Sequence, residues 1–468
     1  MSAESIGTRN PPPSGMSPGG NLALWDVEGL GDELVAYHAI FAPLFARREQ
    51  RHWALKYNQG QMLELERKSI EPMALALEGG DVQAMQQFIS EGAWEDEPIL
   101  ETHRRLVAET LGDPEAGVLI IDGCDFPKQG KDSVGVARQY CGALGKVANC
   151  QASVVACYAS DRGYTLVDRR LYMPQKWFSQ EYAQRREKCG VPADLSFRTQ
   201  PELAWEIIEG LRGALPLRWV TFDEHFGDNP ALLDWVDAAG LLYLAEVPHD
   251  TRVWLRRPRT QVPAAKGREK LCQGEPEAVR LGRVAQQLTE GDWRCYQIKE
   301  GAKGPMLAEF AFLRAVAVRQ GLPGPDVWLV LRRSLGQKRE LKAYLSNAPP
   351  ATSQAELVRL SGMRWPVETA IEESKGELGM DHYEVRGWKG WHHHMTMTFL
   401  AHHFLLRLRI RLGGKITSLD RVPGASAAEG CAPSPRARRR DGHRSHPKNP
   451  APELRCLSLS SSQHLAST

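Results

Sequence analysis

The sequence predicts a mixed α/β fold, and three observations lead to that prediction. Short β-like runs occupy the middle of the chain, at 118–122, 152–159, 164–172, 217–223 and 241–247. Helical patterns, with apolar residues three or four positions apart, lie before and after these runs. Three early strands, then a helix at 201–211, then two more strands are typical of a mixed sheet covered by helices. Residues 160–163 have the composition of a hairpin turn.

Composition and periodicity divide the chain into five parts. Pro-, Gly- and Ser-rich stretches predict disorder at both ends. Strand-like segments at 252–255, 293–299, 327–332 and 340–345 interrupt the core and predict a β-rich insertion. The five parts are a disordered start (1–23), a helical domain with basic patches (24–112), a sheet-forming core in two pieces (113–250 and 351–412), the insertion (251–350) and a basic, disordered tail (413–468).

Bulk composition is that of a globular protein without a membrane span. Of 468 residues, 42% are hydrophobic and 25% are charged. The longest apolar runs fall far short of the roughly 20 residues that a span needs. The N-terminus lacks a secretory pattern, and the nine cysteines show no C-x-x-C pair. These features predict a cytosolic protein with reduced thiols.

The net charge of +2 conceals an asymmetry along the chain. Between residues 407 and 448, eleven Lys or Arg stand against three acids, so the rest of the chain is net acidic. A basic end predicts a polyanionic partner, with a merely solvated tail as the alternative. Lys128, Lys131 and Arg138 lie in a second basic, Gly-rich stretch. Contact with DNA phosphates and a solvated loop both account for that stretch.

Three acidic and two basic residues have positions in the sequence that predict a catalytic site. Asp122 and Asp223 each end an apolar β-like run, which predicts two carboxylates at the rim of a sheet. On a helix that turns by about 100° per residue, Glu368 shares one face with Arg364 and Lys375. A salt-bridged surface helix would show the same spacing. The combination with two strand-end aspartates therefore carries the prediction.

These side chains predict a site for divalent cations that acts on a phosphodiester. Carboxylate oxygens are the ligands that Mg²⁺ prefers, and two ions roughly 3.5–4 Å apart cleave and join phosphodiesters. We expect Asp122, Asp223 and Glu368 to be catalytic and to bind Mg²⁺, with Mn²⁺ as a substitute. Arg364 would hold a DNA phosphate bidentately, and Lys375 would hold one as a point charge.

The pattern Arg364-x-x-x-Glu368-x-x-x-x-x-x-Lys375 resembles the Tyr-Arg-Glu-Lys signature of bacterial insertion-sequence DDE transposases. Segments 122–131, 133–146 and 379–386 resemble one branch of that group, and the resemblance covers roughly residues 24–412. It implies an RNase H-like catalytic core, with one Asp on the first strand, one on the fourth and the Glu on a later helix. It also implies a helical N-terminal domain that helps to bind transposon ends.

The same resemblance implies an activity and its partners. The expected activity is cut-and-paste transposition of an insertion sequence, by metal-dependent cleavage and strand transfer. The expected partner is double-stranded DNA, as terminal inverted repeats and as target, bound by a homodimer on paired ends in the bacterial cytoplasm, at the nucleoid. Ser361 departs from the signature, which has Tyr at this position, and the tail after residue 412 has no counterpart.

Other classes of function leave part of the pattern unexplained. A carboxylate glycosidase would also use two acids, but it gives no role to the Arg/Lys pair. A Holliday-junction resolvase shares the acids but not the helix pattern or the insertion. A decayed or repurposed transposase that only binds DNA would tend to lose the acids, and all three are present. The histidines at 392–394 and 402–403 have no cysteine nearby, so we expect exposed or DNA-proximal rings and no zinc site.

Overall fold

The computed structural model describes residues 29–262, 267–301, 304–336, 338–413 and 426–427. The predicted disordered start, and the predicted tail apart from residues 413, 426 and 427, lie outside these residues. In the described part of the chain, no helix is long and apolar enough to cross a membrane.

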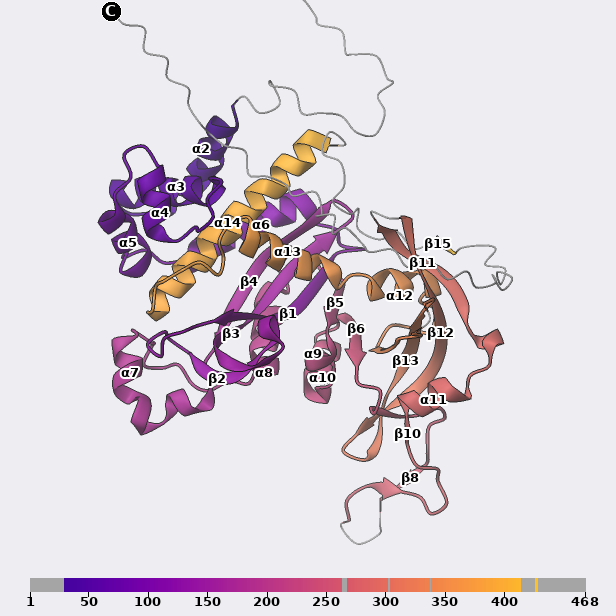
Figure 1. The fold of residues 1–468 in the computed structure, drawn as a ribbon. Coiled ribbons are helices and arrows are strands. Elements are labelled where there is room, and N and C mark those ends of the chain that lie inside the picture. Colours follow the sequence, from indigo (N-terminus) through magenta and orange to yellow (C-terminus); the bar gives the residue numbers. More distant parts are fainter. Residues whose placement is uncertain (1–28, 263–266, 302–303, 337, 414–425, 428–468) are drawn as a thin grey trace, which may run out of the picture.

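The N-terminal helices pack around the last long helix of the chain, α14 (Trp388–Leu412) (Figure 1). The two segments share one apolar core, to which Phe41, Tyr57 and Phe399 belong. The helices are α2 (Leu30–Phe41), α3 (Arg48–Met62), α4 (Ile70–Ala76), α5 (Val82–Ser90) and α6 (Glu97–Leu111).

The expectation of exposed histidines on α14 is wrong, because the N-terminal helices bury three of them and β4 and α13 bury His402. His393, His394, His402 and His403 are at most 1% exposed. The Nδ1 atom of His394 lies 2.7 Å from the Tyr57 hydroxyl, and its Nε2 lies 3.0 Å from the Met380 carbonyl oxygen. Burial lowers the pKa of His394 to about 4. Burial also lowers the pKa of His393 and His403, so these three rings are neutral polar links between α14 and its neighbours.

One mixed sheet forms the centre of the molecule and confirms the predicted fold class. Its core strands lie in the order β4-β3-β1-β5-β6, with β1 antiparallel to β3 and parallel to β5. This order, in which β3 runs antiparallel to the other four strands, is consistent with an RNase H-like fold. The strands are β1 (Val118–Pro127), β2 (Ala137–Cys141), β3 (Lys146–Ser160), β4 (Gly163–Tyr172), β5 (Trp219–Phe222) and β6 (Leu242–Val247).

The first strand is longer than its sequence predicts. We expected it to end at Asp122, but β1 continues to Pro127 because its antiparallel partner β3 keeps pairing along its whole length. The parallel partner β5 stops at Phe222, opposite Ile121. Asp122 is therefore the first residue beyond the β1–β5 pairing, although it is not the end of its strand. The short strand β2, which also pairs with β3, was not predicted.

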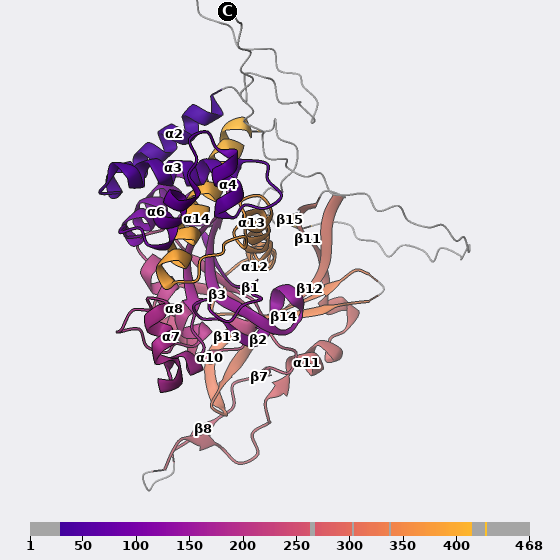
Figure 2. The same ribbon diagram turned by 60° about the vertical axis from the view of Figure 1, so that its left-hand side comes forward.

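Helices cover both faces of the core sheet (Figure 2). Helices α8 (Gln200–Leu211) and α10 (Pro230–Ala238) lie on one face, with the four-residue α9 (Glu224–Gly227) between β5 and α10. On the other face, α13 (Trp365–Gly376) packs against β1, β3 and β4, and α14 packs against β4 beside it. Helix α12 (Gln354–Ser361) is capped by Ser353, whose hydroxyl accepts the Glu356 N–H.

The insertion extends the core sheet. Its strand β14 (Leu341–Ser346) pairs with β6, and the sheet then continues through β13, β12 and β7. Strand β12 was not predicted, because its Ala-, Leu- and Arg-rich sequence has helix propensity and long pairings with its neighbours override it. The other strands and the helix of the insertion are β7 (Arg252–Trp254), β8 (Thr260–Gln261), β9 (Lys270–Leu271), β10 (Val279–Arg280), α11 (Leu281–Gln287), β11 (Arg294–Gly301), β12 (Gly304–Arg319) and β13 (Leu322–Ser334). Outside the insertion lie the short helix α7 (Ala183–Lys188) and the strand β15 (Ser426–Ala427).

Gly227, the last residue of α9, allows that helix to touch β6. A Cβ atom at this position would lie 1.9 Å from the Glu246 carbonyl oxygen. Gly227→Ala should therefore lower the free energy of unfolding by about 1–3 kcal/mol, because α9 must move away from the sheet. Urea denaturation would measure this change. Gly210→Ala is the matched control, since a Cβ there meets nothing within 4 Å on α8. Equal midpoints for the two variants would contradict this account of the α9–β6 contact.

Candidate active site

Three acids stand side by side across three adjacent parallel strands. Ile121 of β1 pairs with Phe222 of β5, and Phe222 pairs with Ala245 of β6. The next residue on each chain is an acid, so Asp122, Asp223 and Glu246 occupy neighbouring positions. Neighbouring strands lie roughly 4.8 Å apart. We call these three residues the acid row.

The acid row faces helix α13. The preceding residues Ile121, Phe222 and Ala245 all belong to the core under α8 and α10. Successive side chains of a strand point to opposite faces, so the acids face the α13 side. Asp122 is only 8% exposed, and its Oδ1 accepts the Gly123 N–H at 2.8 Å. Asp223 caps α9, and its Oδ1 accepts the Phe226 N–H at 3.1 Å.

Burial and like charge make Asp122 reluctant to ionise. Desolvation, together with the carboxylates of Asp223 and Glu368, raises its pKa to about 7. The Arg364 guanidinium and the Gly123 N–H oppose the rise. A carboxylate held in this environment gains stability from any cation placed beside it.

Helix α13 brings its predicted residues to this row. Arg364 precedes the first turn, and its Nε lies 3.2 Å from Oε1 of Glu368, which is 50% exposed. Its Nη1 lies 3.7 Å from Oε2 of Glu246. Burial lowers the pKa of Arg364, but Asp122, Glu368, Asp223 and Glu246 outweigh burial and raise it. Arg364 is the cation that faces all four carboxylates.

Lys375 lies on the same helix face but is already engaged by the protein. Its Nζ donates to the backbone carbonyl of Asp125 at 3.0 Å and lies 5.3 Å from the centroid of the Phe126 ring. It therefore ties the second half of α13 to the distal part of β1. Contact between Lys375 and DNA remains an expectation, and it would require this hydrogen bond to be shared or broken.

The opposite face of α13 is fixed by a buried ionic cluster around Glu373. The carboxylate lies 3.2 Å from Nε2 of His402 and 3.0 Å from the guanidinium of Arg409, both on α14. Tyr164 of β4 donates to it at 3.3 Å. Although burial opposes ionisation, His402 and Arg409 hold the pKa of Glu373 at about 2. This clamp sets the rotation of α13, so that Glu368 faces the acid row.

Glu246 was not anticipated from the sequence. Lys342 of β14 donates to both its oxygens, at 2.8 and 3.1 Å. The available indication was its position one residue before the end of the fifth β-like run. In the runs that contain Asp122 and Asp223 the acid is the last residue, whereas in the fifth run Val247 follows Glu246.

In their present positions, the oxygen ligands of this site meet only part of what a divalent cation requires. Asp122 and Asp223 supply hard oxygen ligands beside each other, and the raised pKa of Asp122 reflects unneutralised charge. Within the described residues, however, no three His, Cys, Asp or Glu side chains converge closely enough to hold a metal ion. Glu368 is paired with Arg364 instead. A third ligand from α13 would have to leave that ion pair.

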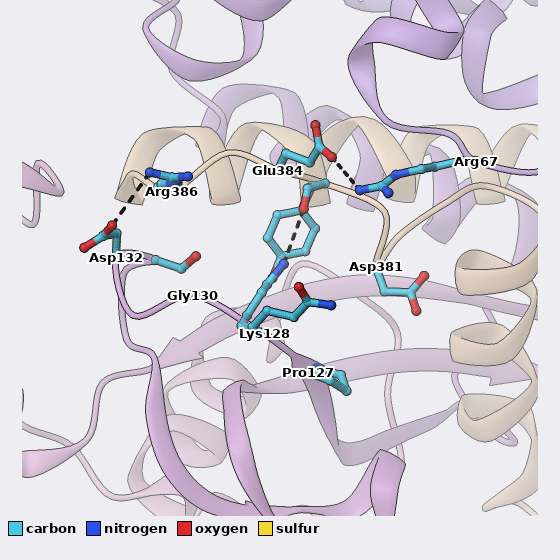
Figure 3. A pocket seen from close by; sticks show the side chains of 11 residues that line it. Arg67, Pro127, Lys128, Gly130, Asp132, Asp381, Glu384 and Arg386 are labelled. Atoms are coloured by element: carbon cyan, nitrogen blue, oxygen red, sulfur yellow. Dashed lines mark hydrogen bonds and ion pairs between the residues drawn. The ribbon is translucent and has the colours of Figure 1, made fainter.

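The basic residues after β1 divide between a pocket and an exposed hairpin. Lys128 lines a cavity of about 500 Å³ between β1, the 377–387 segment and Arg67 (Figure 3). Its Nζ lies 3.5 Å above the Tyr383 ring, and burial lowers its pKa to about 8. It is therefore partly covered, whereas Lys131 and Arg138 are exposed.

Ser361 occupies the position where the Tyr-Arg-Glu-Lys signature has its tyrosine. The residue is buried at the end of α12, and its hydroxyl donates to the Val358 carbonyl at 2.7 Å. Ser361 therefore stabilises the C-terminal end of α12, and its side chain does not reach the acid row.

Comparisons with known proteins identify the family of this fold and site. A model of the DDE superfamily endonucleases matches residues 40–305, more than half of the chain. That range includes both aspartates and Glu246. The chain is also 23% identical over 337 residues to a protein from Microchaete diplosiphon described as a probable transposase for insertion sequence element IS701, covering 71% of this chain and 76% of that protein. Members of the family generally use divalent metal ions. This chain belongs to the DDE superfamily of endonucleases, and it is a nuclease of the class that its sequence predicts.

Proposed function

We propose that this protein is the transposase of a bacterial insertion sequence, and that it moves DNA by a cut-and-paste reaction. The observation that carries the proposal is the placement of Asp122 and Asp223 on adjacent strands, opposite Arg364 and Glu368. The relative from Microchaete diplosiphon, described as a probable transposase, supports the same conclusion. Double-stranded DNA would be bound as two inverted-repeat ends and then as target.

Asp122, Asp223 and Glu368 would hold the divalent cations, Mg²⁺ or Mn²⁺. When bound, such ions polarise a water or 3′-hydroxyl nucleophile and neutralise the scissile phosphate. The buried environment of Asp122 excludes competing water from this side of the site. Glu368 joins the aspartates when Arg364 exchanges its carboxylate partner for a DNA phosphate, which a guanidinium binds bidentately.

The remaining basic residues would follow the DNA backbone away from the site. Lys131 and Arg138 are exposed near the β2–β3 hairpin, and Lys128 lies deeper, at the edge of the pocket. Lys375 would contribute positive charge from α13. The helices within residues 24–112 would help to bind transposon ends, and two protomers would bring paired ends together at the nucleoid in the cytoplasm.

Removing a carboxylate from the site should abolish chemistry without abolishing DNA binding. We expect Asp223→Asn and Glu368→Gln each to lower Mg²⁺-dependent cleavage and joining by about 10³-fold or more, because metal-assisted stabilisation is worth several kcal/mol. The substrate is duplex DNA carrying the flanking ends of the gene, with binding measured in parallel. Glu224→Gln and Glu372→Gln, which alter exposed neighbours on α9 and α13, are the controls. Full cleavage by Asp223→Asn would refute the site assignment.

Stability of the metal-free protein should depend on the charge of Asp122. Its folded-state pKa of about 7 exceeds the ordinary value of 3.8, so folding favours the protonated form. The stabilisation is complete below about pH 4 and is lost as the pH rises through 7. Asp122→Asn should therefore stabilise the metal-free protein at pH 8 by about 2–4 kcal/mol, with little effect at pH 4.

Thermal melts with and without Mg²⁺ would test both the pH dependence and the metal site. Mg²⁺ should raise the Tm of the unmodified chain at pH 8 and should do so much less for Asp122→Asn. Asp161→Asn, at the exposed β3–β4 turn, is the control and should behave as the unmodified chain does. An equal Mg²⁺ response in the Asp122 variant would remove Asp122 from the metal site.

A DNA-binding protein without catalytic activity is the second candidate. Specific binding to the flanking ends, with no cleavage in Mg²⁺ or Mn²⁺, would support it. Ser361 and the tail after residue 412 would then be the first positions to restore.

A further inference from the structure

Glu246 completes the acid row but differs from the two aspartates in its counter-charges. Among the residues that the structure describes, a lysine contacts the carboxylate of Glu246 alone of the three, since Lys342 donates to both oxygens at 2.8 and 3.1 Å. Its Oε2 also lies 3.7 Å from Nη1 of Arg364. Asp122 and Asp223 have no such ion pair among the described residues, since every basic group there lies more than 4 Å from their carboxylates.

Arg364 has more capacity for bonding than its present partners use. Its Nε is buried and makes no hydrogen bond of good geometry, although it lies 3.2 Å from Oε1 of Glu368. The guanidinium therefore rests among four carboxylates, nearest to Glu246 and Glu368. Without Glu246, the attraction toward β6 would be lost, and the remaining attraction would come from Glu368, Asp122 and Asp223.

We propose that Glu246 is a positioning residue that acts through Arg364: it holds the guanidinium at the β6 end of the acid row and so leaves Asp122 and Asp223 available to a divalent cation. Lys342 also neutralises part of the negative charge on Glu246, through its hydrogen bonds to both carboxylate oxygens. The pairing between β14 and β6 places Lys342 there, so the insertion contributes to the arrangement. This inference rests on the proposed function.

Loss of Glu246 should convert Arg364 into a competitor of the metal. In Glu246→Gln the guanidinium shifts toward the aspartates, and a unit charge moved by a few ångströms should raise the Mg²⁺ concentration for half-maximal Tm increase by about threefold to tenfold. At saturating Mg²⁺, single-turnover cleavage of the flanking-end DNA should return to within about threefold of the unmodified rate. A purely structural defect would lower cleavage at every Mg²⁺ concentration, and that result would overturn the inference.

A double-mutant cycle separates this mechanism from a direct effect of the lost charge. In an Arg364→Met background, Glu246→Gln should leave the Mg²⁺ half-point unchanged, because there is no guanidinium to release. An equal shift in both backgrounds would mean that Glu246 acts through its own field, and the proposal would fail. Glu309→Gln, which removes a strand carboxylate paired with Arg333 at 2.6 Å, is the matched control and should show no shift.

Two further comparisons make the outcome decisive. Glu246→Asp keeps the negative charge beside Lys342 but retracts it by one methylene, so this variant should fold and give an intermediate Mg²⁺ half-point. If both Glu246→Gln and Glu246→Asp have the Mg²⁺ half-point of the unmodified chain, the inference is overturned. If Mg²⁺ stabilises the unmodified chain and Asp122→Asn alike, the proposed function fails first. If only the Asp122 variant loses its response while Glu246→Gln retains a normal one, the proposed function stands and this inference falls.

Discussion

Charge compensation beside the parallel strands is the constraint on which the rest of the structure depends. Pairing of β1, β5 and β6 brings three acids into one row, and helix α13 adds Glu368. Uncompensated carboxylates in a half-buried site oppose folding. Arg364 and Lys342 neutralise part of this negative charge. The raised pKa of Asp122 indicates that another part is not neutralised. The fold therefore leaves negative charge partly uncompensated at the site that we propose to bind a divalent cation.

Polar contacts of α13 fix the position and rotation of this helix relative to the acid row. A helix that contacted the sheet only through apolar side chains could rotate or slide. Glu373 prevents this through His402 and Arg409, and Lys375, in the same last turn, binds the helix to the backbone of β1. The histidines of α14 extend the same principle to the N-terminal helices. Their buried hydrogen bonds specify one arrangement of these helices among several that apolar packing would permit.

Hydrophobic periodicity along the sequence predicted the strands and helices whose formation depends on neighbouring residues. The β-like runs and the helix that carries Glu368 follow from periodicities of 2 and 3.6 residues. The full length of β1, the strand β12 and the burial of the α14 histidines depend on partners far away in sequence. The place of Glu246 depends on registry between three strands, which no single segment encodes. Its pairing with Lys342 lay beyond sequence reasoning for the same reason.

The pairing of β14 with β6 also limits how this protein could have evolved and how it can be engineered. An insertion that carries its own sheet can be deleted or exchanged as a cassette, because its removal leaves the host sheet intact. Here the insertion supplies the hydrogen-bond partners of Ala245 and Val247 at the border of the core. Excising residues 251–350 would expose β6 as an open edge, and such edges recruit other chains into aggregates. A shortened descendant would therefore need a substitute strand before it could dispense with the insertion.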